Sequence, residues 1–507
     1  MLAVAPQPAL PATQLPLTAI LRNYAAALDD AGKARVAHFE SRGTIAGAGL
    51  NGTFHTWLDG EDQRDEQRLG PRSETTIRHG DRVWVTNSDG NVRELKGVLL
   101  RRARTERFID AGDFARAPAS VTPRGVAQIA GHSTYALEVA APGGEPQTVY
   151  LDAATWLPVR VAYDDDDGRT TIDLSDWRNV DGHRFPFKSI VSDGVHAFDT
   201  VQRVEAVTLD FVAATDPGIF RVPATTTIDM PSVETLQLTA REGHLYVPVT
   251  ILGKRYEFLL DSGAQNILLD RRVAREAGLV AEGALEASGA QRTGGLQVAR
   301  LAELGIGSGR LHDLVVTTLD LGQSTGGAFR IDGILGYPFF AEALVRVDPI
   351  RPSMTFGRPG SFQPSGTRVP LETDRAFPEA RFALNGNVTA SFIVDTGNAA
   401  ELLLYRPFVE KHRGIVPFTL TGRQSFGIGG RASSYRSTLD RLDIGGYPLY
   451  HVETDVMLAT SGALADRFDA GNVGLGVLKN FVFTFDLRDD ALYVERGANY
   501  DDGRNRR

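Results

Sequence analysis

Two short stretches of the chain have the same pattern of residue types, FLLDSGA at residues 258–264 and FIVDTGN at residues 392–398. In each, three apolar residues lead into an aspartate, a hydroxyl residue and a glycine, and the aspartates lie 395 − 261 = 134 positions apart. An apolar run of this kind is typical of a buried strand. It would deliver Asp261 and Asp395 to strand ends, where glycine permits a sharp turn and a close backbone approach.

Two aspartates held together can hydrolyse a peptide bond without a metal or a nucleophilic side chain. Ionisation of both neighbouring carboxyls is unfavourable, so the pKa of one of them rises and the pair shares a proton. The ionised carboxylate can take a proton from water while the neutral one donates to a substrate carbonyl. The hydroxyls of Ser262 and Thr396 can bond nearby backbone and hold the loops rigid. A single Asp-Ser/Thr-Gly is also ordinary turn chemistry, so the flanking sequence decides between the two interpretations.

The flanking sequence repeats as well, which predicts two copies of one β unit at residues 236–357 and 366–497. A hairpin precedes each aspartate, and a short apolar run and a short helix follow it. Later in each copy come a glycine-rich hairpin and a closing segment, Gly-Ile-Leu-Gly at 333–336 and Gly-Asn-Val-Gly at 471–474. These later features lie 474 − 336 = 138 positions apart, so a four-residue insertion follows the second aspartate loop.

These motifs together resemble the retropepsin-like and pepsin-like aspartic protease superfamily, and specifically bacterial proteins of the aspartyl protease family. The resemblance implies that Asp261 and Asp395 are the catalytic pair, and it implies no metal or other cofactor. It further implies a set of supporting residues: Ser262 and Thr396 to brace the loops, Gly263 and Gly397 to shape the turns, Ile334, Leu335, Gly336, Val473 and Gly474 to support the loops, and Gly294, Gly295, Gly429 and Gly430 in the flaps. Asn472 departs from the pattern, because an apolar residue is usual there; it could bond the loop or weaken that copy.

Single-domain members of this superfamily pair two chains to bring two aspartates together. Here one chain carries both copies, and a linker of only residues 358–365 keeps their effective concentration high. An intramolecular pseudo-dimer is therefore the expected arrangement, with pairing between separate chains left as an alternative. The expected fold is mainly β: an N-terminal helix on a curved antiparallel sheet, followed by two tandem retropepsin-like β-barrel domains.

The N-terminal domain, predicted at residues 17–226, reads as one amphipathic helix followed by many strands. We expect a hairpin turn at Asn51-Gly52, a further helix over residues 92–108 and a linker over residues 213–236. The order of elements and the phrase YLDAATWLPV at residues 150–159 resemble the LolA-like lipoprotein-carrier half-barrel. That resemblance implies an exported protein with a concave apolar face for an acyl chain or a peptide. The alternative is a structural module that packs on the rest of the chain.

Composition excludes several classes of function. The net charge of −9 gives no reason to expect nucleic acid or an anionic membrane surface as a partner. Cysteine is absent, which removes disulfides, thiolate nucleophiles and Cys-ligated zinc. No apolar stretch is long enough to span a bilayer. The first residues lack the regions of a clear signal peptide, and a periplasmic or secreted location is expected from the LolA-like resemblance alone.

The leading hypothesis is an aspartic-type endopeptidase acting on protein or peptide substrates. A catalytically inactive peptide- or lipid-binding protein that uses the same groove is the alternative. In a third hypothesis the peptidase remains and the N-terminal domain has an inhibitory or targeting role. Structure discriminates between the first two, because aspartate oxygens more than about 6 Å apart could not share one water by hydrogen bonds.

Overall fold

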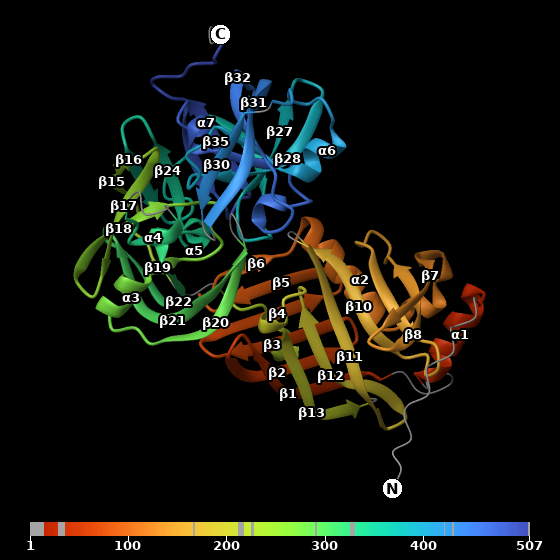
Figure 1. Cartoon of the computed structure of the whole chain (residues 1–507). Helices are drawn as coiled ribbons and strands as arrows, with labels where there is room; N and C mark the ends of the chain where they lie inside the picture. The colour runs from red at the N-terminus through yellow and green to blue at the C-terminus, as the bar shows by residue number, and fades with distance from the viewer. Residues whose placement is uncertain are drawn as a thin grey trace. The chain divides into compact units, whose positions relative to one another are not determined.

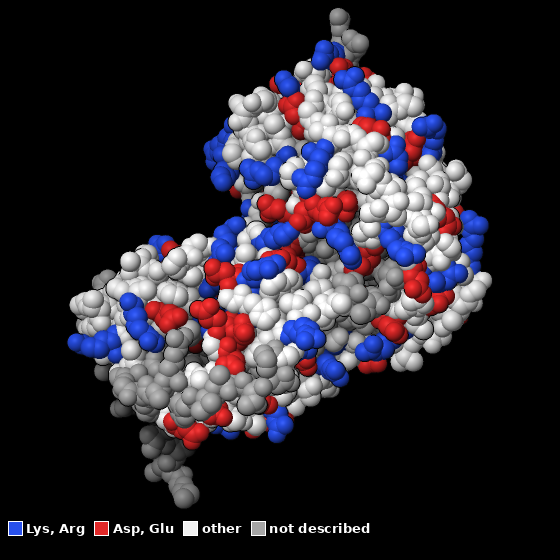
Figure 2. Space-filling model, turned by 180° about the vertical axis from the view of Figure 1, so that it is seen from behind, with Lys and Arg blue, Asp and Glu red and all other residues white. Residues whose placement is uncertain are grey.

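The computed structural model describes residues 15–28, 36–165, 168–210, 217–224, 228–288, 292–324, 330–419, 421–427 and 430–504. The chain forms two compact units, and the division between them falls after Pro223, with the short segment 86–92 and residue 168 grouped with the second unit. Both units are built mainly from β-strands (Figure 1). On the face shown in Figure 2, positive and negative side chains are interspersed.

The first unit is one 13-stranded sheet with helices packed on it (Figure 1). The strand order is β6-β5-β4-β3-β2-β1-β13-β12-β11-β10-β9-β8-β7, so most neighbours in sequence are also neighbours in the sheet. Short turns between such strands force antiparallel pairing. Its helices are α1 (Leu17–Ala27) and α2 (Gly97–Asp110), and its strands are β1 (His38–Gly47), β2 (Leu50–Asp59), β3 (Asp62–Leu69), β4 (Arg72–His79), β5 (Arg82–Asn87), β6 (Val92–Glu94), β7 (Val121–Ile129), β8 (His132–Val139), β9 (Gln147–Asp152), β10 (Pro158–Asp165), β11 (Gly168–Val180), β12 (His183–Ser192) and β13 (Thr200–Asp210).

The predicted helix on a curved antiparallel sheet is confirmed. Helix α1 buries Ile20, Leu21 and Tyr24, the residues that its 3.6-residue periodicity places on one face. They join a core cluster with alternate residues of β8 and β9, such as Leu137 and Val149. The helix is therefore held by tertiary packing of its apolar face, since an isolated helix of this length is marginal in water.

One local prediction for this unit was wrong, and a predicted helix is present with a different start. The β1–β2 turn falls at Ala48-Gly49, both with positive φ (49° and 75°), rather than at Asn51-Gly52. Asn51 and Gly52 lie inside β2, where a Cβ on Gly52 would stand 1.6 Å from the carbonyl oxygen of Arg68 on β3. The predicted helix over 92–108 begins later, because β6 occupies the first positions and α2 starts at Gly97.

The second unit contains two halves that share a run of matching elements, from β17 to β25 in the first and from β27 to β35 in the second, while the first half has additional short strands at its start. Its helices are α3 (Arg271–Glu276), α4 (Leu321–Ser324), α5 (Tyr337–Glu342), α6 (Arg406–Lys411) and α7 (Leu475–Leu478). The strands of the first half are β14 (Ile228–Asp229), β15 (Glu234–Gln237), β16 (Thr239–Arg241), β17 (His244–Ile251), β18 (Lys254–Leu260), β19 (Leu268–Asp270), β20 (Ala281–Ser288), β21 (Arg292–Ile306), β22 (Gly309–Leu319), β23 (Gly333–Leu335), β24 (Leu344–Asp348) and β25 (Ser353–Gly357). Those of the second half are β26 (Thr367–Glu372), β27 (Glu379–Leu384), β28 (Val388–Asp395), β29 (Leu402–Leu404), β30 (Gly422–Gly427), β31 (Gly430–Ile444), β32 (Tyr447–Met457), β33 (Gly471–Gly474), β34 (Phe481–Asp486) and β35 (Ala491–Arg496).

Strand pairing is the same in the two halves. In the first, β18 pairs parallel with β23, β23 antiparallel with β19, and β19 parallel with β22. In the second, β28, β33, β29 and β32 pair in the same directions and order. Parallel pairs of this kind are buried on both faces, which explains the continuous apolar runs before each aspartate.

The two halves join in a six-strand run of one sheet, β15-β25-β24-β34-β35-β26. At its centre Val345 pairs with Phe485 and Val347 pairs with Phe483. Positions 345 and 483 are counterparts, since 483 − 345 = 138, and the same offset relates 347 to 485. The pairing is therefore symmetric about a twofold axis, and one core of buried residues runs through both halves.

Part of the predicted linker is not a linker. Residues 228–237 contain β14 and β15, which pair with β22 and β25 of the second unit. The prediction failed there because strands of two and four residues show too little alternation to be recognised. In the described part of the chain, no helix combines the length and the apolar character needed to cross a membrane.

Candidate active site

The two Asp-Ser/Thr-Gly loops start at the ends of matching strands. Strand β18 ends one residue before Asp261, and β28 ends at Asp395. Each strand is flanked by its closing segment: Leu260 pairs with Leu335 on β23, and Asp395 pairs with Gly474 on β33. These parallel pairings of buried strands thus place each aspartate beside its closing segment.

The hydroxyl residues hold the two loops to each other. The backbone N–H of Ser262 donates to Oγ1 of Thr396 (3.0 Å), and the backbone N–H of Thr396 donates to Oγ of Ser262 (3.0 Å). The same hydroxyls donate across to the opposite strand, Ser262 to the carbonyl of Val394 (2.7 Å) and Thr396 to that of Leu260 (2.8 Å). Both side chains are fully buried. The four bonds are reciprocal, so neither loop can shift without breaking bonds of the other.

The glycines bring each loop against the opposite carboxyl group. A Cβ placed on Gly397 would stand 2.2 Å from Cγ of Asp261, and one on Gly263 would stand 2.6 Å from Cγ of Asp395. Both distances are far below any real Cβ contact, so a side chain at either position would force the facing carboxyl to move. Glycine at these two positions is therefore required for the carboxyls to lie where they do.

The two carboxyl groups meet in one site. Each carboxyl lies against the glycine of the opposite loop, and the two groups interact electrostatically. Burial and then the neighbouring charge of Asp395 raise the pKa of Asp261 well above its usual range, against the opposing backbone N–H groups of Gly263 and Ala264. On the other side, Oδ1 of Asp395 accepts from the backbone N–H groups of Gly397 (2.8 Å) and Asn398 (3.1 Å). A pair of this kind shares a single proton over the pH range in which one carboxyl is ionised.

The closing segments support the loops by backbone bonds. The N–H of Asp261 donates to the carbonyl of Leu335 (3.1 Å), and the N–H of Tyr337 donates to that of Ala264 (2.8 Å). The second half repeats the latter bond, from Leu475 to Asn398 (2.7 Å). The predicted support residues are all buried beside the loops: Ile334, Leu335, Gly336, Val473 and Gly474. Asn472 bonds the loop directly, since its amide donates to the Asp395 carboxyl (2.5 Å).

The predicted flap glycines lie on the long hairpins of each half. In the first, β20 and β21 pair, and Gly294 and Gly295 belong to β21. In the second, β30 and β31 pair up to Gly427 and Gly430. Gly429 lies outside the described residues. The hairpins are thus present at the predicted positions, and their role toward a substrate remains a prediction.

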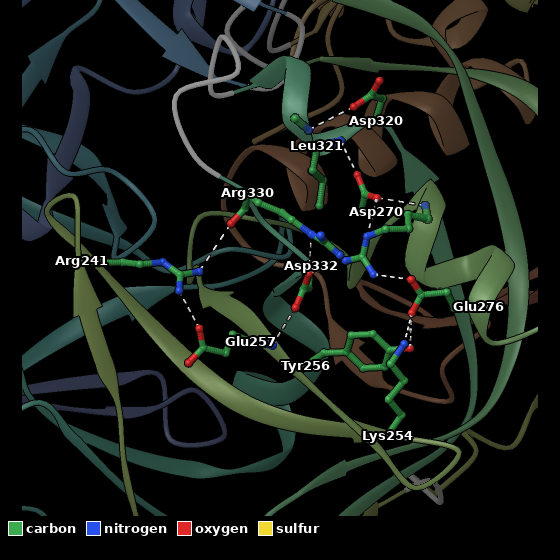
Figure 3. A network of polar contacts seen from close by, with 12 residues as sticks. Arg241, Lys254, Tyr256, Glu257, Asp270, Glu276, Asp320, Leu321, Arg330 and Asp332 are labelled. Carbon is green, nitrogen blue, oxygen red and sulfur yellow. Dashed lines mark hydrogen bonds and ion pairs between the residues drawn. The ribbon is translucent and has the colours of Figure 1, made fainter.

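Sequence reasoning missed a polar network around the first closing segment, which Figure 3 shows. Asp332, next to β23, accepts from the backbone N–H of Glu257 (3.2 Å) and from the guanidinium of Arg272 on α3 (2.5 Å). Asp270 caps α3 by accepting from the N–H of Arg272 (2.9 Å), and it also accepts from that of Leu321 (3.0 Å). The network links α3 to β18 and β23, the two strands that lead to and support the first aspartate loop.

A buried ionic cluster in the second half was also missed. The side chain of Arg375 is 2% exposed and bonds three buried carboxyl groups, those of Glu379, Asp466 (2.8 Å) and Asp469. Burial and the charge of Asp469 raise the pKa of Glu379 to about 9, and burial raises that of Asp466 to about 6. The backbone carbonyl of Arg375 also accepts from the side chain of Gln265 in the first aspartate loop (2.8 Å). One residue of the cluster thus contacts the first aspartate loop through its backbone.

Among the residues that the structure describes, no group of three or more His, Asp or Glu side chains is placed to hold a metal ion.

Comparison with known proteins supports the aspartyl protease superfamily for part of the chain. Residues 247–339 match the model of the aspartyl protease family. The matched residues include Asp261 and the segment 334–336.

Solved structures similar to the chain include a DUF1329 family protein from Desulfovibrio piger, with 17% identity and a TM-score of 0.30, covering 41% of this chain and 98% of the other. A LolA superfamily protein from Nitrosomonas europaea has 16% identity and a TM-score of 0.29, covering 41% and 99%. No curated protein matches the chain.

Removing a loop hydroxyl should destabilise the fold. We expect Thr396→Val to lower the free energy of unfolding by about 1–3 kcal/mol, because the buried N–H of Ser262 loses its acceptor. Ser262→Ala should act similarly, and the double variant should lose less than the sum, because the hydroxyls belong to one network. Urea unfolding followed by fluorescence measures the change. Thr396→Ser keeps the hydroxyl and is the control; equal stability of Thr396→Val and Thr396→Ser would contradict the bracing role.

Proposed function

We propose that the second unit is an aspartic-type endopeptidase. The single observation that carries the proposal is the meeting of Asp261 and Asp395 in one site, with their loops locked by reciprocal hydroxyl bonds. Holding catalytic groups rigidly in place before substrate arrives is how such a site lowers a barrier. The family match over residues 247–339 supports the same class of activity.

Hydrolysis would proceed with one carboxyl ionised and one protonated. The carboxylate takes a proton from a water molecule, whose oxygen forms a bond to the carbonyl carbon, while the protonated carboxyl donates to the carbonyl oxygen. The resulting gem-diol collapses when a proton reaches the amide nitrogen, the C–N bond breaks, and the dyad recovers its single proton. Activity should fall as pH rises through the raised pKa of Asp261, because the proton needed for the carbonyl oxygen is then lost.

The substrate would be a protein or peptide bound in extended form. An extended backbone can pair with strand edges and carry its side chains to alternate sides. The β20–β21 and β30–β31 hairpins are the elements that we expect to cover it. No metal enters the proposed chemistry.

The test is cleavage of an unfolded protein such as casein from about pH 3 to pH 8, where a carboxyl dyad titrates. We expect internal cleavage, identified by mass spectrometry of the products, that a chelator leaves unchanged. A peptide whose scissile amide is replaced by a hydroxyethylene group should inhibit strongly, since it mimics the tetrahedral intermediate. Absence of cleavage at every pH, or cleavage abolished by the chelator, would overturn the proposal.

A further inference from the structure

The two halves of the site differ at one buried position beside the aspartates. Ile334 pairs with Leu259, two residues before Asp261, and Asn472 pairs with Ile393, two residues before Asp395. The two positions are therefore counterparts, and both side chains are buried. A buried amide is unfavourable unless it is hydrogen-bonded, so the departure from an apolar residue needs partners.

A chain of hydrogen bonds fixes which end of each amide faces Asp395. The backbone N–H of Ala400 can only donate, and it donates to Oδ1 of Asn398 (2.9 Å). The amide nitrogen of Asn398 therefore faces Asn472 and donates to its Oδ1 (2.9 Å). This leaves the amide nitrogen of Asn472 to donate to Oδ2 of Asp395 (2.5 Å). The orientation of the final donor thus follows from a backbone group.

This row of hydrogen bonds gives Asp395 a side-chain donor. Asp261 has no corresponding donor, because its half carries Ile334 at the matching position. Both aspartates accept backbone N–H groups from their own loops. Only the second half places an amide at the position where the first half has the hydrocarbon side chain of Ile334. Donors to a carboxyl group favour its charged form, and an extra donor on one member of a pair favours ionisation of that member.

We infer that Asn472 is a positioning residue that makes the dyad asymmetric, keeping Asp395 as the carboxylate and leaving the shared proton on Asp261. The roles then separate. Asp395 takes the proton of the attacking water, and Asp261 donates its proton to the carbonyl oxygen of the substrate. This assignment rests on the proposed peptidase function and adds to it which aspartate acts as base and which as acid.

Other titratable groups face Asp395 from the surrounding elements. Asp261 lies across the site. His244 on β17 interacts with Asp395 and with the backbone of Gly397, and burial lowers the pKa of its imidazole. Tyr405, after β29, lies within electrostatic range of Asp395, and burial raises its pKa well above the usual value, so it stays neutral.

Behind Tyr405 lie the charges of Arg375, Asp466 and Asp469. All of these groups are common to the wild type and to variants at position 472. A change in the pH profile of such variants therefore reports the amide.

The first test is the pH profile of kcat/KM for the full chain. Asn472→Leu preserves size and removes the donor, and it should move the acid limb up by about one pH unit, equivalent to a tenfold change in the ionisation constant. The alkaline limb should stay in place. Asn398→Ala frees the amide of Asn472 to reorient, and it should move the acid limb in the same direction by less. Ile334→Leu, at the matched position, neither adds nor removes a hydrogen-bond donor, so any loss of kcat/KM in this variant should be the same at every pH. If Asn472→Leu instead lowers kcat/KM by the same factor at every pH, the inference is wrong.

The second test does not require peptide cleavage. A small alkyl epoxide esterifies a carboxylate faster than a carboxylic acid, and mass spectrometry of the peptides locates the ester. Asp395 should be labelled in preference to Asp261, and its labelling in Asn472→Leu should require a pH about one unit higher. Preferential labelling of Asp261 would refute the role of Asn472. The expected labelling in a protein that cleaves nothing would refute the proposed function and the acid and base roles, but it would still support Asn472 as the residue that keeps Asp395 ionised.

Discussion

Changing either aspartate to asparagine should abolish most peptide cleavage. Proton transfer by a positioned group contributes about 10²- to 10⁴-fold to a rate, so Asp261→Asn and Asp395→Asn should each lower kcat/KM by that amount. Asparagine keeps the size of the side chain, so the loops and their reciprocal hydroxyl bonds should persist. Loss of activity would then report chemistry rather than folding. The measurement is the initial rate of casein cleavage at the optimum pH of the wild type.

Matched controls exist in both halves. Asp313 and Asp440 are exposed, and Asp313→Asn and Asp440→Asn should leave the rate unchanged. The double variant at the dyad should be about as inactive as either single variant, because the two carboxyls act as one unit. Near-normal rates in both single variants would exclude a shared site. Loss in only one would indicate a site built from two copies of that half in separate chains.

Much of this site could be predicted because its signals are local. The apolar run before Asp261 requires a buried strand, and the Ser262-Gly263 pair requires a tight loop, whatever the rest of the chain does. The same pattern of residues around Asp395 then predicted a second loop of the same kind. Sequence predicted that the hydroxyls brace the loops. It could not specify that each accepts from the other loop, because Ser262 and Thr396 are 134 positions apart.

The features that were missed depend on partners distant in sequence. Arg375 meets Asp466 and Asp469 across 91 and 94 positions, and nothing near any of these residues indicates the others. Asn472 was recognised as a departure from the pattern, but its contact with Asp395 follows from the meeting of β28 and β33. The error in the predicted position of the hairpin turn has a different cause. The turn lies at Ala48-Gly49, which is not the Asn-Gly pair that usually marks such turns.

Removing Arg375 should strongly destabilise the second unit. Arg375→Leu leaves the three buried carboxyl groups of Glu379, Asp466 and Asp469 without their cation. Breaking a buried ion pair by removing one partner costs about 3–5 kcal/mol, because the remaining charges are desolvated and unpaired. We expect a loss of that size in the free energy of unfolding near pH 8, measured by urea denaturation. Arg381→Leu, on the exposed side of β27, is the control and should have little effect.

The carboxyl groups bonded to Arg375 should make the free energy of unfolding depend on pH. The pKa of Glu379 is about 9 in the fold against an ordinary value of 4.5, and that of Asp466 is about 6 against 3.8. The folded chain therefore holds protons that the unfolded chain releases, and these groups make stability fall as pH rises through those windows. Glu379→Gln removes one of these titrations and should flatten the fall between about pH 4.5 and pH 9.

The cost of Arg375→Leu should grow with pH for the same reason. Near pH 4 Glu379 and Asp466 are largely protonated in the fold, and the variant should lose less stability there than at pH 8. As pH rises, each carboxyl must either keep its proton or ionise without the guanidinium beside it, and both choices are unfavourable. A loss of stability that is equal at pH 4 and pH 8 would mean that Arg375 contributes through packing alone, and that its charge does not stabilise the acidic groups bonded to it.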